Sequence, residues 1–587
     1  MATSATGTHA PQLDEKRFTP RELNGARILC ECLIAQGVDT IFGYPGGVLL
    51  PLYDVLAEYP EIRHILVRHE QAAAHAADGY ARATGRVGVC MGTSGPGATN
   101  LVTGIATAML DSAPVVAITG QVSKALIGKD GFQETDITGI TLPITKHNWL
   151  VMETADLAET VKKAFVIAST GRPGPVLIDI PKDVFQGKTF FKGYPSEVKM
   201  RGYNPTVYGH VRQIKQAAKM INEAERPVIL SGWGVTISGA FDELMELAER
   251  GDIPVINTLQ GLSSFPTAHP LSLGMPGMHG GIHANHAIND SDVLIAIGTR
   301  FDDRVTGNLK SFAKNSKIIH IDIDPAEIGK NVPVHIPVVG DVKNVLQVLN
   351  KYVDKRQHSE WREKIAEWKV KDVKRRENEM SRRGRLRPQY IVQQMSEVLG
   401  GDAVITVDVG QNQMWVAQHF NFQKSRSFVS SGGLGTMGFG LPSAMGAKIG
   451  LGEKTPVWAV CGDGGFQMTL QELATLIQDD IRVKIAIFNN GVLGMIRQWQ
   501  QVFYDNRQHS TPLISPDYLK LADAYGIRAW RVTEREDVAR VIAEANEWPG
   551  PTIVEFVIPE VDNVFPMVPP GGSNLDALSA EDVDKQH

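Results

Sequence analysis

Short apolar runs alternate with amphipathic segments along most of the chain. Strand-like runs such as residues 63–70 (RHILVRHE), 87–97 (VGVCMGTSGPG) and 114–121 (PVVAITGQ) are separated by segments with the period of a helix. Strands that alternate with helices pair in parallel, with helices on both faces of the sheet, so the pattern predicts an α/β, doubly wound fold. Such sheets bind ligands at the carboxyl ends of their strands, so polar residues that directly follow apolar runs are the candidate site residues.

The alternation of strands and helices occurs in three separate segments, which predicts three parallel-sheet domains. A chain of 587 residues is too long for one hydrophobic core, in agreement with this division. A basic run between Lys351 and Arg387 has the charge of a nucleic-acid-binding arm, but interleaved acids and few aromatics favour a solvated linker helix. The expected parts are a disordered tail (1–18), a first domain (19–190), a linker (191–225), a central domain (226–350), a linker helix (351–387) and a third domain (388–587).

The composition is that of an ordinary globular protein, with 43% hydrophobic and 21% charged residues and a formal net charge of -6. This charge gives no reason to expect a nucleic acid or a membrane as partner, and no apolar run approaches the ~20 residues of a membrane span. The four cysteines lack metal-site spacing and indicate a cytoplasmic protein with reduced thiols. The amino-terminal tail lacks the apolar core of a signal peptide, and an organelle transit peptide is the less favoured interpretation.

The most informative stretch covers residues 459–495. A short apolar run ends in GDGG, which contains Asp463, and after a helical segment a second apolar run ends in NNG, which contains Asn490. In a strand–helix–strand unit both polar ends lie at the same edge of the sheet, so these two residues are expected to lie close together. A carboxylate, an amide oxygen and backbone exposed by glycine suit a magnesium ion that carries a diphosphate. Taken singly, each motif is more often an ordinary turn.

The two motifs at this separation resemble the diphosphate motif of the thiamine diphosphate enzymes. The resemblance implies that Asp463, the side chain of Asn490 and the backbone carbonyl of Val492 hold Mg²⁺. Met437 stands in a glycine-rich turn and by itself would be core filling, but the matching family residue holds the cofactor in a bent shape. The implied contacts with thiamine diphosphate in this domain are Gly410, Gln411, Gly435, Met437, Gly464, Gly465, Leu493, Gly494 and Met495.

Glu70 is the informative residue of the first domain. It follows the strand-like run ILVRH and opens an alanine-rich helix, so it stands at a carboxyl strand end. By itself, a glutamate at a helix start is explained by the helix dipole. The segment RHEQAAAHAADGYAR resembles the one that carries the glutamate of thiamine enzymes. That resemblance implies that Glu70 hydrogen-bonds the pyrimidine N1′ and lets the cofactor remove its own C2 proton.

Two further segments resemble acetohydroxyacid synthases, also called acetolactate synthases. The loop GKDGFQETD (128–136) is by itself an ordinary polar loop, but it matches the loop that brings Phe132 and Gln133 into the active site of that family. The segment over 274–307 matches the flavin-binding domain of that family. The FAD contacts implied by the resemblance are Arg172, Gly232, His279, Arg300, Asp302, Asp322, Ile323 and Asp341.

Other residues of these segments allow two interpretations. Gly232 begins a GxG that lacks the third glycine of a dinucleotide fingerprint, and RFDDR is equally an ion-pair turn. The resemblance assigns Arg304 to the carboxylate of the second substrate, which suits a planar bidentate donor. Trp499 lies on a short expected helix and would ordinarily be core, whereas the resemblance places it at the acceptor ketoacid. The apolar tail over 564–572 resembles a segment that closes over the active site.

These resemblances cover nearly the whole chain after residue 19 and imply the activity of an acetohydroxyacid synthase. Such an enzyme decarboxylates pyruvate on thiamine diphosphate and transfers the hydroxyethyl carbanion to a second 2-ketoacid, pyruvate or 2-ketobutyrate. The products, 2-acetolactate and 2-aceto-2-hydroxybutyrate, begin branched-chain amino-acid biosynthesis. FAD would be structural and without redox turnover, and a homodimer or homotetramer would form the active sites. A separate regulatory small subunit is a further candidate partner.

Three other functions stay open at the level of the sequence. A pyruvate oxidase uses the same two organic cofactors, although RFDDRVTG and GKDGFQETD argue against it. A glyoxylate carboligase is expected to carry an apolar residue in place of Glu70, and an inactive scaffold would not need Glu70, Asp463 and Asn490 together. Ser123 stands where many plant members of the family have proline, at the mouth of the substrate channel, which puts inhibitor sensitivity in doubt.

Overall fold

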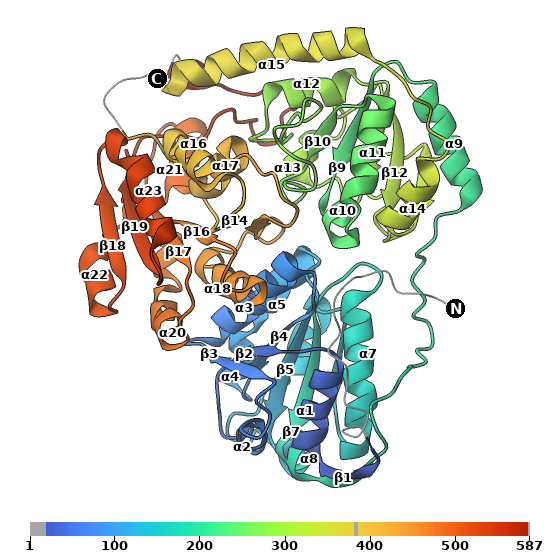
Figure 1. The fold of residues 1–587 in the computed structure, drawn as a ribbon, viewed down its shortest axis with the longest axis vertical. Helices are drawn as coiled ribbons and strands as arrows, with labels where there is room; N and C mark the ends of the chain where they lie inside the picture. The colour runs from blue at the N-terminus through green and yellow to red at the C-terminus, as the bar shows by residue number, and fades with distance from the viewer. Residues whose placement is uncertain (1–18, 381–385, 585–587) are drawn as a thin grey trace. The chain divides into compact units, whose positions relative to one another are not determined.

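The computed structural model describes residues 19–380 and 386–584, so the expected tail over 1–18 lies outside the described residues. By its internal contacts the chain divides into two units, residues 1–81 with 86–204, and residues 82–85 with 205–587. Within the described residues, three parallel sheets are present, one in the first unit and two in the second (Figure 1). The expected α/β, doubly wound class is therefore confirmed.

The sheet of the first unit has six described strands in the order β3-β2-β4-β5-β7-β6. These strands are β2 (Thr40–Gly43), β3 (Arg63–Leu66), β4 (Gly88–Gly92), β5 (Val115–Gln121), β6 (His147–Leu150) and β7 (Val176–Pro181). Every residue of β5 and β7 is buried, as expected of parallel strands that are covered on both faces. A separate antiparallel ribbon pairs β1 (Arg21–Asn24) with β8 (Lys188–Phe191).

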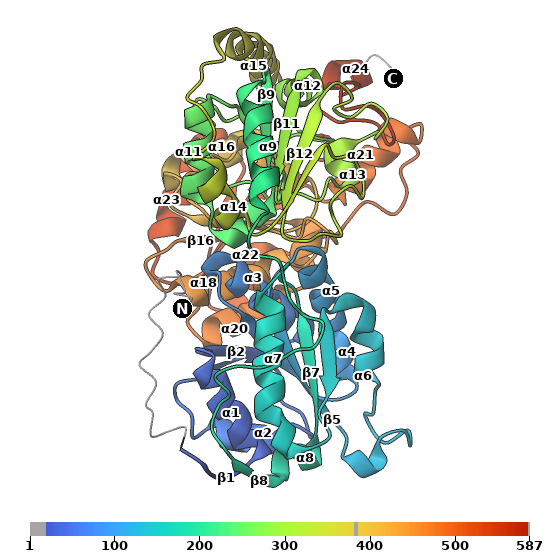
Figure 2. The ribbon, with the colours of Figure 1, turned by 90° about the vertical axis from the view of Figure 1, so that its right-hand side faces the viewer.

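Helices cover both faces of this sheet, because each parallel connection must cross from one strand end to the other (Figure 2). They are α1 (Gly25–Ala35), α2 (Leu50–Leu56), α3 (Glu70–Thr84), α4 (Pro96–Asn100), α5 (Val102–Leu110), α6 (Ile137–Thr141), α7 (Leu157–Ser169) and α8 (Lys182–Gln186). Helices α1 and α7 pack against each other and contribute to the apolar core of this unit.

The second unit begins with a five-stranded sheet in the order β10-β9-β11-β12-β13. Its strands are β9 (Pro227–Ser231), β10 (Val255–Asn257), β11 (Val293–Ile297), β12 (Lys317–Asp322) and β13 (Ile336–Val339). Its helices are α9 (Val211–Asn222), α10 (Trp233–Ser238), α11 (Phe241–Gly251), α12 (Ile282–Asp290), α13 (Asp303–Thr306), α14 (Val342–Leu349) and α15 (Ser359–Met380).

Helix α9 corrects the linker expected over 191–225. It packs on α14 and β13, and Ile214, Ala217 and Ile221 lie in the core of the central sheet (Figure 2). These apolar residues have the spacing of a helix, but the many polar residues between them led to the prediction of a linker. The central domain therefore begins at α9, and the linker is shorter than expected.

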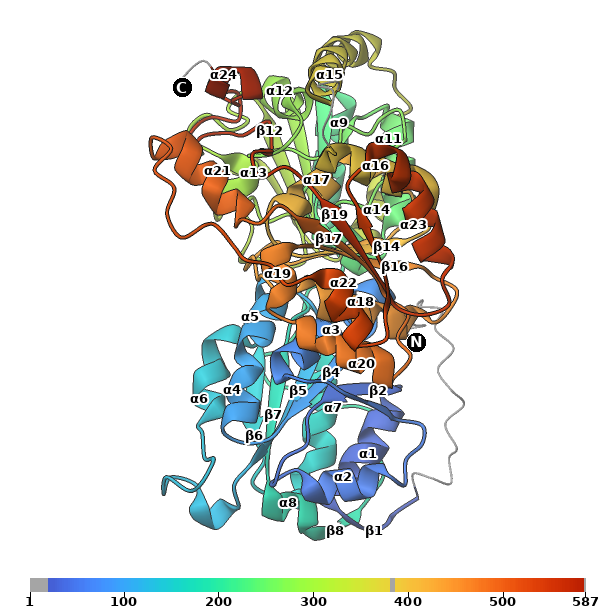
Figure 3. The ribbon, with the colours of Figure 1, turned by 90° about the vertical axis from the view of Figure 1, so that its left-hand side faces the viewer.

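A second parallel sheet of this unit has the order β15-β14-β16-β17-β19-β18. Its strands are β14 (Val404–Val407), β15 (Phe428–Ser430), β16 (Val457–Gly462), β17 (Lys484–Asn489), β18 (Arg528–Val532) and β19 (Thr552–Val557). Its helices are α16 (Pro388–Leu399), α17 (Gln411–His419), α18 (Gly440–Leu451), α19 (Asp463–Gln467), α20 (Leu473–Gln478), α21 (Gly494–Phe503), α22 (Tyr518–Ala524), α23 (Val538–Glu547) and α24 (Ala580–Asp584). Helices α16 and α23 pack together over one face, and α22 lies against β18 and β19 (Figure 3).

Helix α15 differs from the solvated linker helix expected over 351–387, of which residues 381–385 lie outside the described residues. It packs on α12, and Trp361 and Ile365 belong to an apolar core of the central domain (Figure 1). The Trp361 indole N–H donates to the Pro227 carbonyl at 3.2 Å. Further along, the buried Asp372 carboxylate contacts His283 Nδ1 at 2.9 Å. The helix is thus bound to the central domain along one face, and the opposite face carries the charge.

All four cysteines are buried, in agreement with their expected place in the core. Burial raises the pKa of the Cys90 thiol to about 12, which keeps it protonated. Among the residues that the structure describes, no helix combines the length and the apolar character that crossing a bilayer requires.

Replacing Trp361 by alanine is expected to lower the thermal midpoint of unfolding. Trp361 is 3% exposed, and its removal leaves a cavity beneath α15 at a cost of ~3–5 kcal/mol. Val370 of the same helix is 53% exposed, so Val370→Ala should change stability by less than ~0.5 kcal/mol. Thermal denaturation followed by circular dichroism compares the two variants, and equal midpoints would contradict the packing of α15.

Candidate functional site

Asp463 is buried at the carboxyl end of β16, where it opens α19. Its side chain is 2% exposed, and Oδ2 accepts hydrogen bonds from the Gly491 amide at 2.9 Å and the Ser515 hydroxyl at 3.2 Å. Burial raises the pKa of this carboxyl, while the hydrogen bonds from Ser515 and Gly491 act in the opposite direction. A cation that reaches this buried carboxylate would stabilise its charge further.

Asn490 follows the neighbouring strand β17 and lies close to Asp463, as expected from the strand–helix–strand pattern. Its Oδ1 accepts from the Val492 amide at 3.3 Å, and its Nδ2 donates to Gln411 Oε1 at 3.4 Å. Gly491 lies in the turn between Asn490 and Val492, and its carbonyl accepts a hydrogen bond from the Leu513 amide at 2.7 Å. Gln411 follows β14, so three adjacent parallel strands deliver these polar side chains to one edge of the sheet.

Glycines let the backbone pack closely against the side chains at this site. A Cβ at Gly464 would lie 2.9 Å from Leu493 Cδ2 and 3.6 Å from Met437 Cε. A Cβ at Gly465 would overlap the Asp408 carboxylate, and one at Gly494 would overlap Gln411 Oε1. These glycines leave bare backbone among the residues expected to contact a diphosphate, and together they are called the glycine cradle.

Asp408 is a buried residue of this site that the sequence analysis missed. Its carboxylate is 0% exposed and accepts from the backbone amides of Val409 at 2.8 Å, Gly438 at 3.0 Å and Gly440 at 3.0 Å. Burial raises its pKa to about 6. These bonds hold the glycine-rich turn that carries Gly435 and Met437. The available signal was an acid directly after a buried strand, in VDVG.

Gly410 and Gly435 adopt backbone conformations that favour glycine, with φ of 149° and 73°. Helix α21 confirms the short helix expected after Asn490. On it, Met495 and Trp499 are half-buried, and the Trp499 ring meets Phe503 edge-on at 5.3 Å between centroids. Ile496 of the same helix is 52% exposed, so α21 presents both a packed and an open face.

In the first unit, Glu70 opens α3 and is 8% exposed. Its Oε2 accepts a hydrogen bond from Asn100 Nδ2 at 2.9 Å, a partner that the sequence analysis missed. Its Oε1 faces Gly97, where a Cβ would lie only 3.1 Å away. Asn100 ends α4 within the TSGPGATN turn, so this turn orients the carboxyl group of Glu70.

The loop over 128–136 carries Phe132 with 88% of its surface exposed, and Gln133 in the left-handed region with φ of 59°. Glu134 closes the loop by accepting from its own backbone amides, among them that of Gly131 at 2.9 Å. A Cβ at Gly95 would lie 3.0 Å from Gln133, so the loop approaches the TSGPGATN turn closely.

The residues expected to contact FAD in the central domain follow adjacent strands of its sheet. Gly232 follows β9, Arg300 and Asp302 follow β11, Asp322 ends β12 before Ile323, and Asp341 follows β13. A Cβ at Gly232 would overlap the Gly298 carbonyl, so these two backbones touch where the strand order reverses.

Several of these acids also have local partners. Asp302 accepts from the Arg304 and Val305 amides at 3.0 and 3.1 Å, and Asp341 accepts from the Asn344 amide at 3.1 Å, so both cap helices. The Arg300–Asp302 and Arg304–Asp303 pairs are longer, at 3.6 and 3.8 Å. The side chain of Arg304 is 61% exposed. RFDDR is therefore a helix cap with two loosely held arginines.

His279 and Arg172 do not directly follow strands of this sheet. His279 Nδ1 contacts the Pro566 carbonyl at 3.1 Å, and burial lowers its pKa to about 4, so the ring is neutral near pH 7. It therefore binds the apolar tail to the central domain. Arg172 belongs to the first unit, where its Nε donates to the Ser112 hydroxyl at 2.8 Å.

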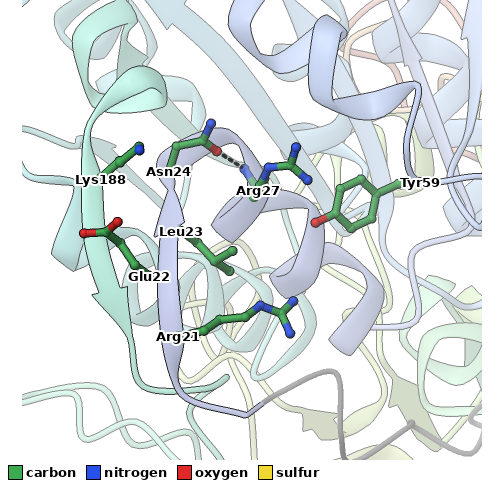
Figure 4. A pocket seen from close by; sticks show the side chains of 7 residues that line it. All are labelled: Arg21, Glu22, Leu23, Asn24, Arg27, Tyr59 and Lys188. Atoms are coloured by element: carbon green, nitrogen blue, oxygen red, sulfur yellow. Dashed lines mark hydrogen bonds between the residues drawn. The ribbon is translucent and has the colours of Figure 1, made fainter.

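Figure 4 shows a surface hollow at the start of α1. Arg21 and Arg27 line it, and each is already paired with a glutamate, Arg21 with Glu31 at 2.9 Å and Arg27 with Glu58 at 2.6 Å. Two of its cationic groups are thus paired with local glutamates, and Lys188 also lines the hollow.

Comparisons with known proteins agree with this fold and site. Three models of thiamine pyrophosphate enzyme domains match the chain: the N-terminal TPP binding domain over residues 23–140, the central domain over 214–349 and the C-terminal TPP binding domain over 408–556. The fold is thus that of the thiamine pyrophosphate enzymes, with thiamine diphosphate as the cofactor class.

Curated relatives narrow this class. The chain is 50% identical over 574 residues to an acetolactate synthase of Mycobacterium bovis, covering 96% of this chain and 92% of the relative. It is 51% identical over 562 residues to a probable acetolactate synthase large subunit of Methanocaldococcus jannaschii, covering 94% of each. An acetolactate synthase large subunit of Corynebacterium glutamicum is 49% identical over 568 residues, covering 95% of this chain and 90% of the relative. The chain belongs to the acetolactate synthase family.

The loop over 128–136 depends on a buried acid with an unusual pKa. Asp179 accepts from the Thr119 hydroxyl at 2.8 Å and from Gln121 Nε2 at 3.0 Å, and the same Nε2 donates to the Thr135 carbonyl at 2.8 Å. Burial raises the pKa of Asp179 to about 7, and the nearby Asp136 acts in the same direction.

Asp179→Asn is expected to change the pH dependence of stability. Because the folded pKa lies above the ordinary value of 3.8, the folded state binds the proton more tightly. Its stabilisation is therefore complete below about pH 4 and is lost as the pH rises through about 7. The melting temperature of the native protein minus that of the variant should fall across this range and then level off. A difference that is independent of pH would contradict the assignment.

Proposed function

We propose that the protein is an acetohydroxyacid synthase, which decarboxylates pyruvate and joins the remaining two-carbon unit to a second 2-ketoacid. Pyruvate as acceptor gives 2-acetolactate, and 2-ketobutyrate gives 2-aceto-2-hydroxybutyrate, the first common step towards the branched-chain amino acids. The observation that carries the proposal is the meeting of Asp463, Asn490 and Gln411 beside a glycine cradle, in a chain about half identical to enzymes named acetolactate synthase.

We infer that Mg²⁺ and the diphosphate of thiamine diphosphate bind at this cradle. The donor set fits a hard cation, because it consists of the Asp463 carboxylate, the Asn490 amide oxygen and the Val492 carbonyl. The raised pKa of Asp463 supports this, since the burial cost of its charge falls when a cation is present. Gly464, Gly465 and Gly494 would let phosphate oxygens approach the backbone, and Gly410, Gln411, Leu493 and Met495 would line the remainder.

Thiamine diphosphate, when bound, supplies the carbon nucleophile and the electron sink for decarboxylation. Glu70 would hold the pyrimidine N1′ through its Oε1, with Asn100 orienting the carboxyl group through Oε2. Met437 would support the bent cofactor, and Gly435 would present its carbonyl to the pyrimidine amine.

We also propose that FAD binds along the carboxyl edge of the central sheet and has no net redox role. Gly232 and Gly298 leave bare backbone at the point where the strand order reverses, which suits a pyrophosphate. Asp322 ends a strand and would accept from ribose hydroxyls, while Arg300 would pair with a phosphate. Among the described residues, the buried Trp233 Nε1 has no hydrogen-bond partner and supports a polar ligand here. His279, Ile323, Asp302, Asp341 and Arg172 would complete the contacts.

The substrate pocket is assigned to exposed side chains. Arg304 would bind the carboxylate of the acceptor ketoacid, for which its loosely held guanidinium is available. Phe132, Gln133 and Trp499 would shape the pocket and exclude water. The exposed ring of Phe132 is expected to be covered in the assembled enzyme.

We propose that the active enzyme is at least a homodimer, because Glu70 and Asp463 serve opposite ends of one cofactor that two subunits would share. Two relatives are named as large subunits, which supports a separate small regulatory subunit for this chain as well.

The test of the proposed function is a product assay. The purified protein with thiamine diphosphate, Mg²⁺, FAD, pyruvate and 2-ketobutyrate should release carbon dioxide and form both acetohydroxy acids, as measured by chromatography. Bleaching of the flavin during pyruvate turnover without acetolactate would instead identify a pyruvate oxidase, and absence of carbon dioxide release would identify an inactive scaffold.

Glu70→Gln is expected to slow exchange of the C2 proton of bound thiamine diphosphate by at least ~100-fold, because an amide cannot share a proton with N1′. NMR of the exchange in deuterated buffer measures this, and the affinity for the diphosphate end should change by less than ~3-fold. Glu58→Gln alters a surface glutamate and serves as the control. An unchanged exchange rate would refute the assigned role.

A further inference from the structure

Two buried amide side chains and the half-buried Asn490 form a hydrogen-bonded series that ends at Asn490. Gln498 of α21 donates from Nε2 to the Val564 carbonyl at 2.9 Å, and its Oε1 accepts from the Val564 amide at 2.8 Å. The same Oε1 accepts from Gln411 Nε2 at 3.0 Å. Gln411 Oε1 in turn accepts from Asn490 Nδ2 at 3.4 Å.

The backbone of Val564 determines the orientation of the first amide. A backbone N–H can only donate and a backbone carbonyl can only accept, so Gln498 must face Val564 with its nitrogen on the carbonyl and its oxygen on the amide. Gln498 Oε1 faces Gln411 and can only accept, so Gln411 must turn its nitrogen towards it. The same Gln411 nitrogen also donates to the Asp562 carbonyl at 2.9 Å. Gln411 therefore presents its oxygen to Asn490.

Asn490 receives this orientation as the last member of the series. Because Gln411 offers an acceptor, the Asn490 amide turns its nitrogen towards Gln411 and leaves Oδ1 on the side of the Val492 amide. Only this orientation allows Asn490 to offer an oxygen to a cation beside Asp463. The opposite orientation would present an NH₂ group, which cannot ligate Mg²⁺.

The first two members of the series are isolated from water. Gln498 is 0% exposed and Gln411 is 4% exposed, so solvent cannot replace a missing partner. Gly494 is needed as well, because a Cβ there would overlap Gln411 Oε1.

We propose that Gln498 is a positioning residue for the cation site. The Val564 backbone fixes the orientation of Gln498, Gln498 fixes that of Gln411, and Gln411 fixes that of Asn490, so that Asn490 presents its oxygen to the divalent cation. The inference rests on the proposed function, since it requires a cation at Asp463 and Asn490. The packing of the segment over 562–567 would then affect the affinity of the site for the cation. The link is Gln498, which contacts neither the cofactor nor the metal.

Gln498→Met tests the proposal, because methionine keeps the length of the side chain and removes its polarity. Mn²⁺ serves as the probe for Mg²⁺, and its binding in the presence of saturating thiamine diphosphate is measured from the electron paramagnetic resonance signal of free Mn²⁺. The dissociation constant should rise by ~10-fold or more, as for other residues that orient a metal ligand. Turnover at saturating Mg²⁺ should stay within ~2-fold, since Gln498 acts through binding.

Gln501→Met is the matched control. Gln501 lies on the same helix and accepts from Asn563 Nδ2 at 2.9 Å, so it contacts the same segment outside the amide series. Its variant should bind Mn²⁺ like the native protein. If Gln498→Met does not fold, Gln498→Asn carries the same test, because its shorter amide cannot reach both Val564 and Gln411.

Asp463→Asn separates the two hypotheses. If this variant binds Mn²⁺ as tightly as the native protein, the cation site of the proposed function is wrong. If it loses binding while Gln498→Met and Gln501→Met both bind normally, the cation site stands and the positioning role of Gln498 is overturned. Equal losses in Gln498→Met and Gln501→Met would also overturn it, because a loosened tail would then account for both.

Discussion

The buried carboxylate of Asp463 is the constraint on which the third sheet depends. It lies at the end of β16, accepts from the Gly491 amide and the Ser515 hydroxyl, and has a pKa that burial raises. An acid in this position destabilises the fold unless a cation or further donors accompany it. The turn after β17 and the helix after β14 bring an amide oxygen and open backbone to the same place, so the site is organised around the charge of one side chain.

The same physical arrangement recurs in the other two sheets. In each, the strand order reverses between two neighbouring strands, and chain connections leave in opposite directions there. Gly232 and Gly298 occupy this point in the central sheet, and the TSGPGATN turn with Glu70 and Asn100 lies beside it in the first unit. Buried polar groups then position the loops, as Asp408 does for the turn before α18 and Asp179 for the loop over 128–136.

Predictions from the sequence succeeded where a residue directly follows a strand and failed where its partner is distant. The proximity of Asp463 and Asn490 followed from one strand–helix–strand unit, because parallel pairing brings both strand ends to one edge. Asp408, Asn100 and Gln498 were missed, since each acts through hydrogen bonds to residues 30 or more positions away. Helices α9 and α15 were taken for linkers because their apolar residues are sparse, and only packing shows which face is buried.

The amino-acid sequence by itself determined the α/β class, the family and the residue types at each strand end, because these depend on local periodicity and short motifs. The tertiary structure decided which groups are desolvated and which atom each amide presents. Asp179 and Asp408 are ordinary acids in sequence, and their raised pKa values arise only from burial. The orientation of Asn490 depends on a backbone 74 residues further along the chain, at Val564, and such a dependence exists only once the chain has folded and excluded water.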